Sequence, residues 1–281
     1  MINLNGKLVE TSANSLDADN RGLNYGDAVF ETLRVSAGRI SFWEDHYFRL
    51  MASMRILRME IPMNFTMEFL SEEILKTIAT VLESKNAIRV KILVWRVAGG
   101  KYNPANRDVE YVISYEEMDT SFYNLNEEAY EVDLFKDHYI TAGLLSTLKT
   151  NNKIVNVLGS IYAEENMYQN CLLLNDKKQV VEALNGNLFL VNGYKIKTPP
   201  LDDGCLNGVM RKQLIAIIQN IPDYVLEIES VSPFELQKAD ELFLTNVITG
   251  IQPISKYRKK EYTSTVAKDL LAKVNTKARL G

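Results

Sequence analysis

The feature that most constrains the fold of this chain is its pattern of short strand-like runs, tight-turn dipeptides and helical stretches. Asn5-Gly6 and Ala37-Gly38 each separate two short β-like runs, as expected for hairpins. Apolar residues recur at helical spacing over 43–58 and again over 64–82. Further strands are predicted at 87–95 and 110–115. We therefore expect an α+β fold in which two helices cover one face of a sheet.

A polar segment with little periodicity, residues 117–126, marks the predicted domain boundary. We expect a smaller N-terminal α+β domain over 1–118, a linker over 119–126 and a larger C-terminal α+β domain over 127–281. In the second domain, strands are predicted at 130–135, 171–174, 188–191, 194–197 and 241–245, and helices at 153–166, after Asn207-Gly208 and from Thr263 onward.

The charge balance gives no reason to expect a polyanionic partner. The 281 residues carry a formal net charge of −4, so binding to nucleic acid or to an anionic membrane is not expected. The first residues lack the basic-then-apolar pattern of a signal peptide, and no apolar run approaches a membrane span, so we expect a cytoplasmic protein. Cys171 and Cys205 lack the spacing of a disulfide framework or a metal site, and neither is expected.

Histidine is scarce, which restricts the groups that could transfer protons. Only His46 and His138 are present, so acid–base chemistry would rest on Lys, Glu, Asp, Tyr or Cys. Lys149 is a candidate amine, because it follows the mostly apolar segment 141–148 and precedes two asparagines that can bond loop backbone. On composition alone, a lysine at a strand end is more often a solvated surface residue, and both interpretations stay open.

Two segments could hold an anion. At 207–211 the chain passes from an Asp- and Gly-rich loop into an apolar helix, whose first N–H groups would suit a phosphate. Residues 245–250 follow an apolar strand and could form a second anion-binding turn. Each segment is also explained by an ordinary helix start or turn.

Taken in order, several segments resemble the motifs of fold type IV pyridoxal-phosphate (PLP) enzymes, the class IV aminotransferase family. The matching segments are RGLNYGDAVFETLRV (21–35), HYFRL (46–50), LKTNNKIVNVL (148–158), VVEALNGNLFLV (180–191), TPPLDDGCLNGVMR (198–211) and LTNVITGIQPI (244–254). The resemblance covers residues 2 to 256 and implies the two-domain fold of these enzymes, PLP as cofactor and a homodimer.

The resemblance also implies roles for individual residues. Lys149 takes the position of the Schiff-base lysine, and Glu182 that of the carboxylate that faces the pyridine nitrogen of PLP and keeps it protonated. Arg49 matches the arginine that reaches the cofactor phosphate. The backbone positions that match the two phosphate-binding turns are Val209 with Met210 and Val247 with Ile248. Branched-chain transaminases have a tyrosine near Lys153-Ile154, so no residue is assigned to the cofactor's 3-oxygen.

The reaction depends on smaller differences within the family. After the F-E pair, aminodeoxychorismate lyases have threonine, where branched-chain transaminases tend to have glycine and D-amino-acid transaminases valine; this chain has Thr32. The loop 96–104 resembles the R-x-x-G-G-R-G-Y-x-P loop of the lyases, with Lys101 in place of an Arg-Gly pair. The leading hypothesis is a lyase that converts 4-amino-4-deoxychorismate to 4-aminobenzoate and pyruvate, a step of folate biosynthesis. In it, Lys149 removes the ring proton at C4 and Thr32 orients the lysine amine.

Three alternatives and assignments remain open at this stage. Arg89, Arg96 and Tyr102 are candidates for binding substrate carboxylates, although arginines on strands are more often solvated or paired. The close rival to the lyase is a branched-chain or D-amino-acid transaminase that uses 2-oxoglutarate. A more distant alternative is a non-catalytic binding protein on the same fold. The retention of Lys149, Glu182 and Arg49 argues against it.

Overall fold

The computed structural model describes residues 1–11, 17–82 and 87–280. These residues form two compact units: unit 1 comprises Met1–Ser121 with Lys149–Asn152, and unit 2 comprises Phe122–Leu148 with Lys153–Gly281. The domain boundary predicted from the sequence puts Lys149–Asn152 in the C-terminal domain. The structure packs this segment with unit 1, because its backbone pairs with a strand more than a hundred residues earlier, which no local pattern reveals.

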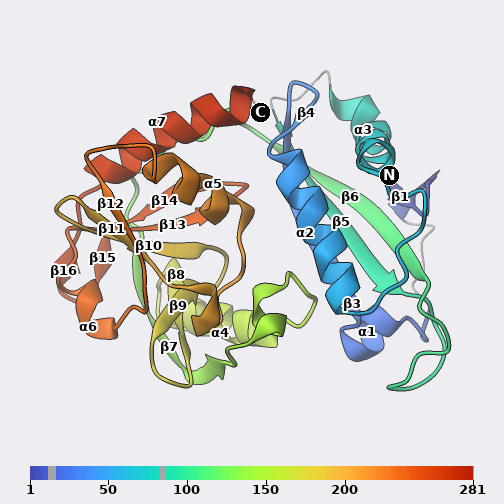
Figure 1. Cartoon of the computed structure of the whole chain (residues 1–281), viewed down its shortest axis with the longest axis horizontal. Helices are drawn as coiled ribbons and strands as arrows, with labels where there is room; N and C mark the ends of the chain where they lie inside the picture. The colour runs from blue at the N-terminus through green and yellow to red at the C-terminus, as the bar shows by residue number, and fades with distance from the viewer. Residues whose placement is uncertain (12–16, 83–86, 281) are drawn as a thin grey trace. The chain divides into compact units, whose positions relative to one another are not determined.

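Unit 1 is built on a six-stranded sheet with the strand order β2-β1-β6-β5-β3-β4 (Figure 1). Its strands are β1 (Ile2–Leu4), β2 (Lys7–Val9), β3 (Ala28–Ser36), β4 (Arg39–Ile40), β5 (Ala87–Arg96) and β6 (Val109–Met118), and its helices are α1 (Arg21–Tyr25), α2 (Trp43–Ile56) and α3 (Met67–Leu82). Both predicted hairpins are confirmed as β1–β2 and β3–β4. Their turns use positive φ at Asn5-Gly6 and Ala37-Gly38, as tight hairpin turns require.

One face of this sheet is covered by α2 and α3. Leu50 and Met54 of α2 and Ile74 of α3 belong to the same buried cluster as Leu33 of β3 and Ile92 of β5. Because successive strand residues point to opposite faces, the odd-numbered residues of β3 face the helices and the even-numbered ones lie on the other side. We call that other side, which carries Phe30, Thr32 and Arg34, the outer face of the unit 1 sheet.

Unit 2 contains two five-stranded sheets, with orders β12-β11-β10-β13-β14 and β16-β15-β7-β8-β9. The strands are β7 (Glu131–Ile140), β8 (Asn170–Asn175), β9 (Val180–Ala183), β10 (Asn187–Asn192), β11 (Lys195–Thr198), β12 (Val225–Ile228), β13 (Glu241–Asn246), β14 (Gly250–Ile254), β15 (Lys256–Tyr257) and β16 (Lys260–Glu261). The helices are α4 (Ile154–Glu165), α5 (Val209–Ile218), α6 (Pro233–Leu236) and α7 (Thr265–Leu280), with 3₁₀ turns at Leu144–Thr147 and Leu201–Asp203.

Strand β8 shows why strands of unit 2 have continuous apolar sequences. Leu172 and Leu174 belong to a core cluster that includes Leu188 of β10 and Leu242 of β13. Cys171, on the opposite face of β8, belongs to a second cluster, against which residues of α4 pack. A strand that is buried on both faces has no polar side to alternate with.

The α+β prediction is confirmed, and most differences lie at element ends. Helix α3 begins at Met67 rather than at Asn64, because Phe65 and Thr66 form turns with Pro62 and Asn64. The Thr66 hydroxyl then accepts a hydrogen bond from the Phe69 N–H at 3.1 Å, as a helix cap does. Among the described residues, no helix is long and apolar enough to cross a membrane.

Candidate active site

Lys149 lies at the edge of the unit 1 sheet, beside the start of β3. The Phe30 N–H donates to the Lys149 carbonyl at 2.9 Å, and the Asn151 N–H donates to the Ala28 carbonyl at 3.1 Å. This antiparallel pairing places Lys149 opposite Phe30, so both side chains project from the outer face. The Lys149 Nζ atom is 4.6 Å from the centre of the Phe30 ring. The amine therefore lies against the face of an aromatic ring, the arrangement of a cation–π contact.

Asn152 ties the lysine segment to α1. Its Nδ2 donates to the Gly26 carbonyl at 3.3 Å. Gly26 ends α1 with a φ of 63°, and a Cβ there would lie 2.5 Å from Asn152 Oδ1. Only glycine satisfies both the left-handed backbone and this close approach, so the Y-G-D sequence around Gly26 has a local structural reason.

Thr32 lies on the outer face, two residues from Phe30 along β3. It is 7% exposed and is directly opposite Lys91 of β5 in the strand register. Among the residues that the structure describes, no hydrogen-bond partner is found for its hydroxyl. Thr32 is thus a partly accessible donor on the same surface as the Lys149 amine.

Arg49, predicted to reach the cofactor phosphate, is held by a carboxylate on the helix-facing side of β3. Its Nε donates to Glu31 Oε1 at 2.7 Å and its Nη2 to Glu31 Oε2 at 2.5 Å, a bidentate arrangement. Burial raises the pKa of Glu31, but the Arg49 and His46 side chains outweigh it and lower that pKa from 4.5 to about 2. Glu31 is therefore ionised at neutral pH and fixes the direction of the guanidinium group.

His46 completes this buried cluster. Its Nδ1 is 2.6 Å from Glu31 Oε2. Since the carboxylate accepts, Nδ1 carries the proton. The pKa of His46 is lowered, chiefly because burial disfavours the charged ring. The ring is thus neutral, and its Nε2 is buried without a hydrogen-bond partner among the described residues.

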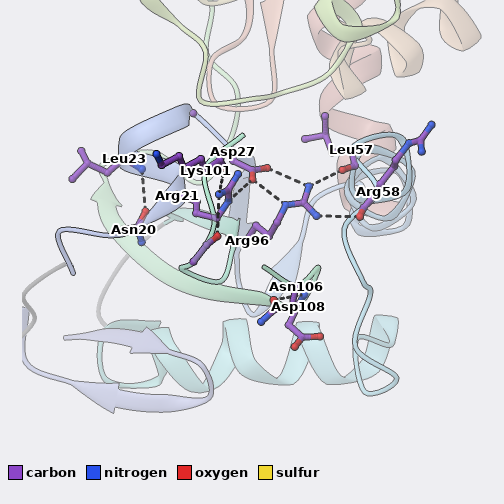
Figure 2. A network of polar contacts seen from close by, with 12 residues as sticks. Asn20, Arg21, Leu23, Asp27, Leu57, Arg58, Arg96, Lys101, Asn106 and Asp108 are labelled. Carbon is purple, nitrogen blue, oxygen red and sulfur yellow. Dashed lines mark hydrogen bonds and ion pairs between the residues drawn. The ribbon is translucent and has the colours of Figure 1, made fainter. Parts of the chain in front are cut away.

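Arg96, predicted to bind substrate, is the centre of a network that fixes three segments of unit 1 (Figure 2). Its Nε donates to Asp27 Oδ2 at 2.9 Å, and its Nη1 and Nη2 donate to the carbonyls of Arg58 and Leu57 at 3.0 and 2.7 Å. Arg21 bonds the same Asp27 oxygen at 2.9 Å. These bonds give Arg96 a structural role at the end of α2, and its contact with substrate stays a prediction.

The other two predicted substrate residues are more accessible. Arg89 lies on the outer face of the unit 1 sheet and pairs with Glu116 at 2.6 Å, with 40% of its side chain exposed. Tyr102 is 92% exposed and contacts the Tyr25 ring at 5.9 Å between centroids. Its loop is held by Arg21, whose Nη1 donates to the carbonyls of Gly99 and Lys101 at 3.1 and 2.6 Å.

Glu182 lies on β9 of unit 2, where a loop and a neighbouring amide surround it. Glu182 is 8% exposed. Its carboxylate accepts a hydrogen bond from the Leu206 N–H at 2.9 Å. Asn187 Nδ2 is 3.5 Å from the same oxygen and also donates to the Leu206 carbonyl at 2.9 Å. Asn187 thereby holds the loop that approaches Glu182.

The predicted phosphate site at Val209 and Met210 is the first turn of α5. Gly208 is the N-cap and provides no side-chain hydrogen bond, and the first N–H groups of any α-helix lack an intrahelical acceptor. A Cβ on Gly208 would lie 2.0 Å from Asn187 Oδ1. Glycine is therefore required here by close packing rather than by its backbone angles.

The second predicted phosphate turn, at Val247 and Ile248, joins β13 to β14. The Asn246 side-chain oxygen accepts from the N–H groups of Ile248 and Thr249, both at 2.9 Å. Tyr123 donates its hydroxyl to the Val247 carbonyl at 2.8 Å. The turn is thus held from both sides.

Comparison with known proteins identifies the family. The family model "Amino-transferase class IV" matches residues 28–257. The chain belongs to the class IV aminotransferase family. An aminodeoxychorismate lyase of Vibrio harveyi is 26% identical over 237 residues, which are 84% of each chain. A D-alanine aminotransferase of Listeria innocua is 27% identical over 261 residues, 90% of this chain and 86% of the relative.

Solved structures show the same fold. A branched-chain aminotransferase of Thermoproteus uzoniensis superimposes with a TM-score of 0.85 at 22% identity, covering 97% of this chain and 92% of that one. A T.th. branched-chain aminotransferase, solved with pyridoxamine 5′-phosphate, gives 0.83 at 23% identity over 98% and 94%. Class IV aminotransferases depend on PLP, so this protein is a PLP-dependent enzyme.

The residues of unit 2 fit this cofactor. Thr245 pairs with Asn187 across β13 and β10, and its hydroxyl is buried without a hydrogen-bond partner among the described residues. A buried polar atom that lacks a partner is costly, which suits a polar ligand beside it. Glu182 offers the charge that a protonated pyridine nitrogen needs, and the start of α5 offers N–H groups for a phosphate.

Alanine at position 208 tests the packing of this loop. The added Cβ would force Asn187 or the 206–208 loop to move, and such overpacking costs about 1–3 kcal/mol. We expect Gly208→Ala to lower the unfolding free energy by this amount and to weaken PLP binding, measured by denaturant titration and by cofactor titration. In a G208A/N187A double variant, the second substitution should cost less than it costs alone; strictly additive losses would contradict the steric explanation.

Sequence reasoning about this class IV aminotransferase missed two kinds of residue. Glu31 and His46 lie within the motif segments, yet the sequence does not predict their pairing with Arg49. The spacing between Glu31 on a strand and Arg49 on the next helix gives no direct sign of contact. Lys91 and Ser114 lie on the outer face beside Thr32. The sequence does not single them out, because only the strand register brings the three together.

Proposed function

We propose that this enzyme is a 4-amino-4-deoxychorismate lyase, which forms 4-aminobenzoate and releases pyruvate. The observation that carries the proposal is the position of Thr32. It lies on the outer face two residues from Phe30, whose ring contacts the Lys149 amine at 4.6 Å, so a hydroxyl and an amine share one surface. The relation to the Vibrio harveyi lyase supports it.

Lys149 is the proposed proton-transfer base. Its amine, held against the Phe30 ring, takes the ring proton from C4 of the substrate, and Thr32 orients the amine by a hydrogen bond. The bond between the ring carbon and the enolpyruvyl oxygen then breaks and the ring becomes aromatic. The enolpyruvate that leaves takes a proton at its methylene carbon and becomes pyruvate. PLP, when bound, supplies an electron sink for the negative charge left at C4.

The remaining predicted residues would hold the cofactor. We propose that Glu182 pairs with the pyridine nitrogen and that Arg49, kept in position by Glu31, meets the phosphate. Backbone N–H groups at Val209 and Met210, and at the turn of Val247 and Ile248, would bind a phosphate; the Ile248 N–H also donates to Asn246. Arg89, Arg96 and Tyr102 remain proposed substrate contacts. We further propose that the protein is cytoplasmic and forms a homodimer. Light scattering of the purified protein tests the dimer.

The test of the lyase is product analysis with purified PLP-loaded protein. Incubation with 4-amino-4-deoxychorismate is expected to give pyruvate and 4-aminobenzoate in equal amounts. Thr32→Val should lower the rate about tenfold, the loss of one hydrogen bond worth about 1.4 kcal/mol in the transition state, whereas Thr32→Ser should retain most of it. If neither product forms, the lyase proposal is wrong.

An amino-acid transaminase is the second candidate, and the Listeria innocua D-alanine aminotransferase favours it. In that reaction Lys149 would return the proton to the cofactor rather than support elimination. Turnover of a D- or branched-chain amino acid with 2-oxoglutarate, together with conversion of the cofactor spectrum to the pyridoxamine form, would establish it. Thr32→Val should then have little effect on kcat.

A further inference from the structure

Three neighbouring strands place a lysine between two hydroxyls on the outer face of unit 1. In the register of β3, β5 and β6, Thr32 is opposite Lys91, and Lys91 is opposite Ser114. Directly opposed side chains on one face lie about 5 Å apart at Cβ. The three side chains therefore form one row across the sheet. The helix-facing residues Val90 and Ile92 on either side of Lys91 are fully buried, which confirms that Lys91 points outward.

The Lys91 ammonium group lies over an aromatic ring. Its Nζ is 4.8 Å from the centre of the Phe30 ring, and among the described residues no carboxylate forms an ion pair with it. Glu116, in the next row, is paired with Arg89 at 2.6 Å instead. Burial and the Arg89 charge both lower the pKa of Lys91. A bound anion would offset both effects.

The same ring brings this row to the reactive amine. Lys149 Nζ is 4.6 Å and Lys91 Nζ is 4.8 Å from the centre of the Phe30 ring. The two nitrogen atoms are thus separated by no more than the sum of these distances. Lys149 reaches Phe30 from the segment on one side of β3, and Lys91 reaches it from β5 on the other side.

We propose that Lys91, with the hydroxyls of Thr32 and Ser114, forms a carboxylate-binding site that selects amine substrates carrying a carboxylate group. The three donors suit a carboxylate, which accepts several hydrogen bonds and carries the opposite charge. An anion held there lies beside Lys149, so the site also places the substrate near the amine. This inference rests on the proposed function only in taking Lys149 as the reacting amine.

The test is binding of benzoate, an unreactive carboxylate, to the PLP-loaded protein by titration calorimetry. Lys91→Met should raise the benzoate Kd about tenfold, equivalent to about 1.4 kcal/mol, and should leave the Kd of uncharged benzamide unchanged. Lys91→Arg should retain most of the affinity, and Ser114→Ala should lose part of it. Lys7→Met is the control, because Lys7 is an exposed lysine on β2, near the far edge of the same sheet.

Kinetics add a second measurement. For an amine substrate with a carboxylate, Lys91→Met should raise KM and change kcat little, as expected when binding common to ground and transition states is removed. Unchanged benzoate affinity in Lys91→Met and Ser114→Ala, with the cofactor's visible band intact, would overturn the carboxylate site alone. A wild-type protein with neither a visible band nor product would instead overturn the proposed function.

Discussion

Alanine in place of Lys149 is expected to remove the visible absorption band of the enzyme-bound cofactor and to lower turnover by about 10³-fold or more. The amine has two proposed tasks, covalent attachment and proton transfer, and proton transfer alone is typically worth about 10²–10⁴-fold. Lys91, the other amine beside the Phe30 ring, reaches it from a different strand. Absorbance spectroscopy and steady-state rates of product formation are the measurements.

Lys153→Ala is the matched control for this variant. Lys153 is four residues further along the chain and is half-buried at the N-cap of α4. Its replacement should leave the spectrum and the rate nearly unchanged. Equal losses in both variants, or full activity in Lys149→Ala, would show that Lys149 is not the reacting amine.

Glutamine in place of Glu31 is expected to lower the unfolding free energy by about 3 kcal/mol, because it removes a buried carboxylate that binds Arg49 through both of its oxygens. The carboxylate is 2% exposed and binds Arg49 through both oxygens. The orientation of Arg49 is lost with it, so PLP affinity should fall as well. Denaturant titration and cofactor titration at neutral pH measure the two effects.

The pH dependence of the unfolding free energy tests the stabilisation by Glu31 independently. Its pKa falls from 4.5 to about 2 in the folded protein, so the native state holds fewer protons than the unfolded state between these values. The stabilisation is therefore full above pH 4.5 and is lost as the pH falls toward 2. Glu31→Gln should lack this component. Glu116→Gln is the control: Glu116 is 70% exposed, and its loss should cost at most about 1 kcal/mol.

Local patterns predicted the elements of the fold well and their ends less well. The hairpin at Asn5-Gly6 follows from turn chemistry that needs no distant contact. The strand predicted at 130–135 instead runs as β7 to Ile140, because the pairing of Ile140 with Asn175 of β8 extends it past a bulge. Such pairing is set by a partner far along the chain, which periodicity does not contain.

In the candidate site, too, the sequence predicts residue types better than contacts between residues distant in the chain. Motif resemblance singled out Lys149 and Arg49, whose residue types the chemistry requires. It did not reveal that Glu31 fixes Arg49 or that Lys91 lies beside Thr32, because these contacts depend on strand register and on the side of β3 from which each residue projects. For Arg96, motif resemblance suggested a substrate contact, which stays a prediction, and did not reveal its hydrogen bonds to Asp27 and to the end of α2.

Reductive labelling of the lysines tests the central assignment most directly. The PLP-loaded protein is treated with sodium borohydride, digested, and its peptides are analysed by mass spectrometry. A phosphopyridoxyl group on Lys149 alone is the predicted result. A label on Lys91, whose amine contacts the same Phe30 ring, or the absence of any labelled lysine in protein that shows the cofactor's visible band, would contradict it.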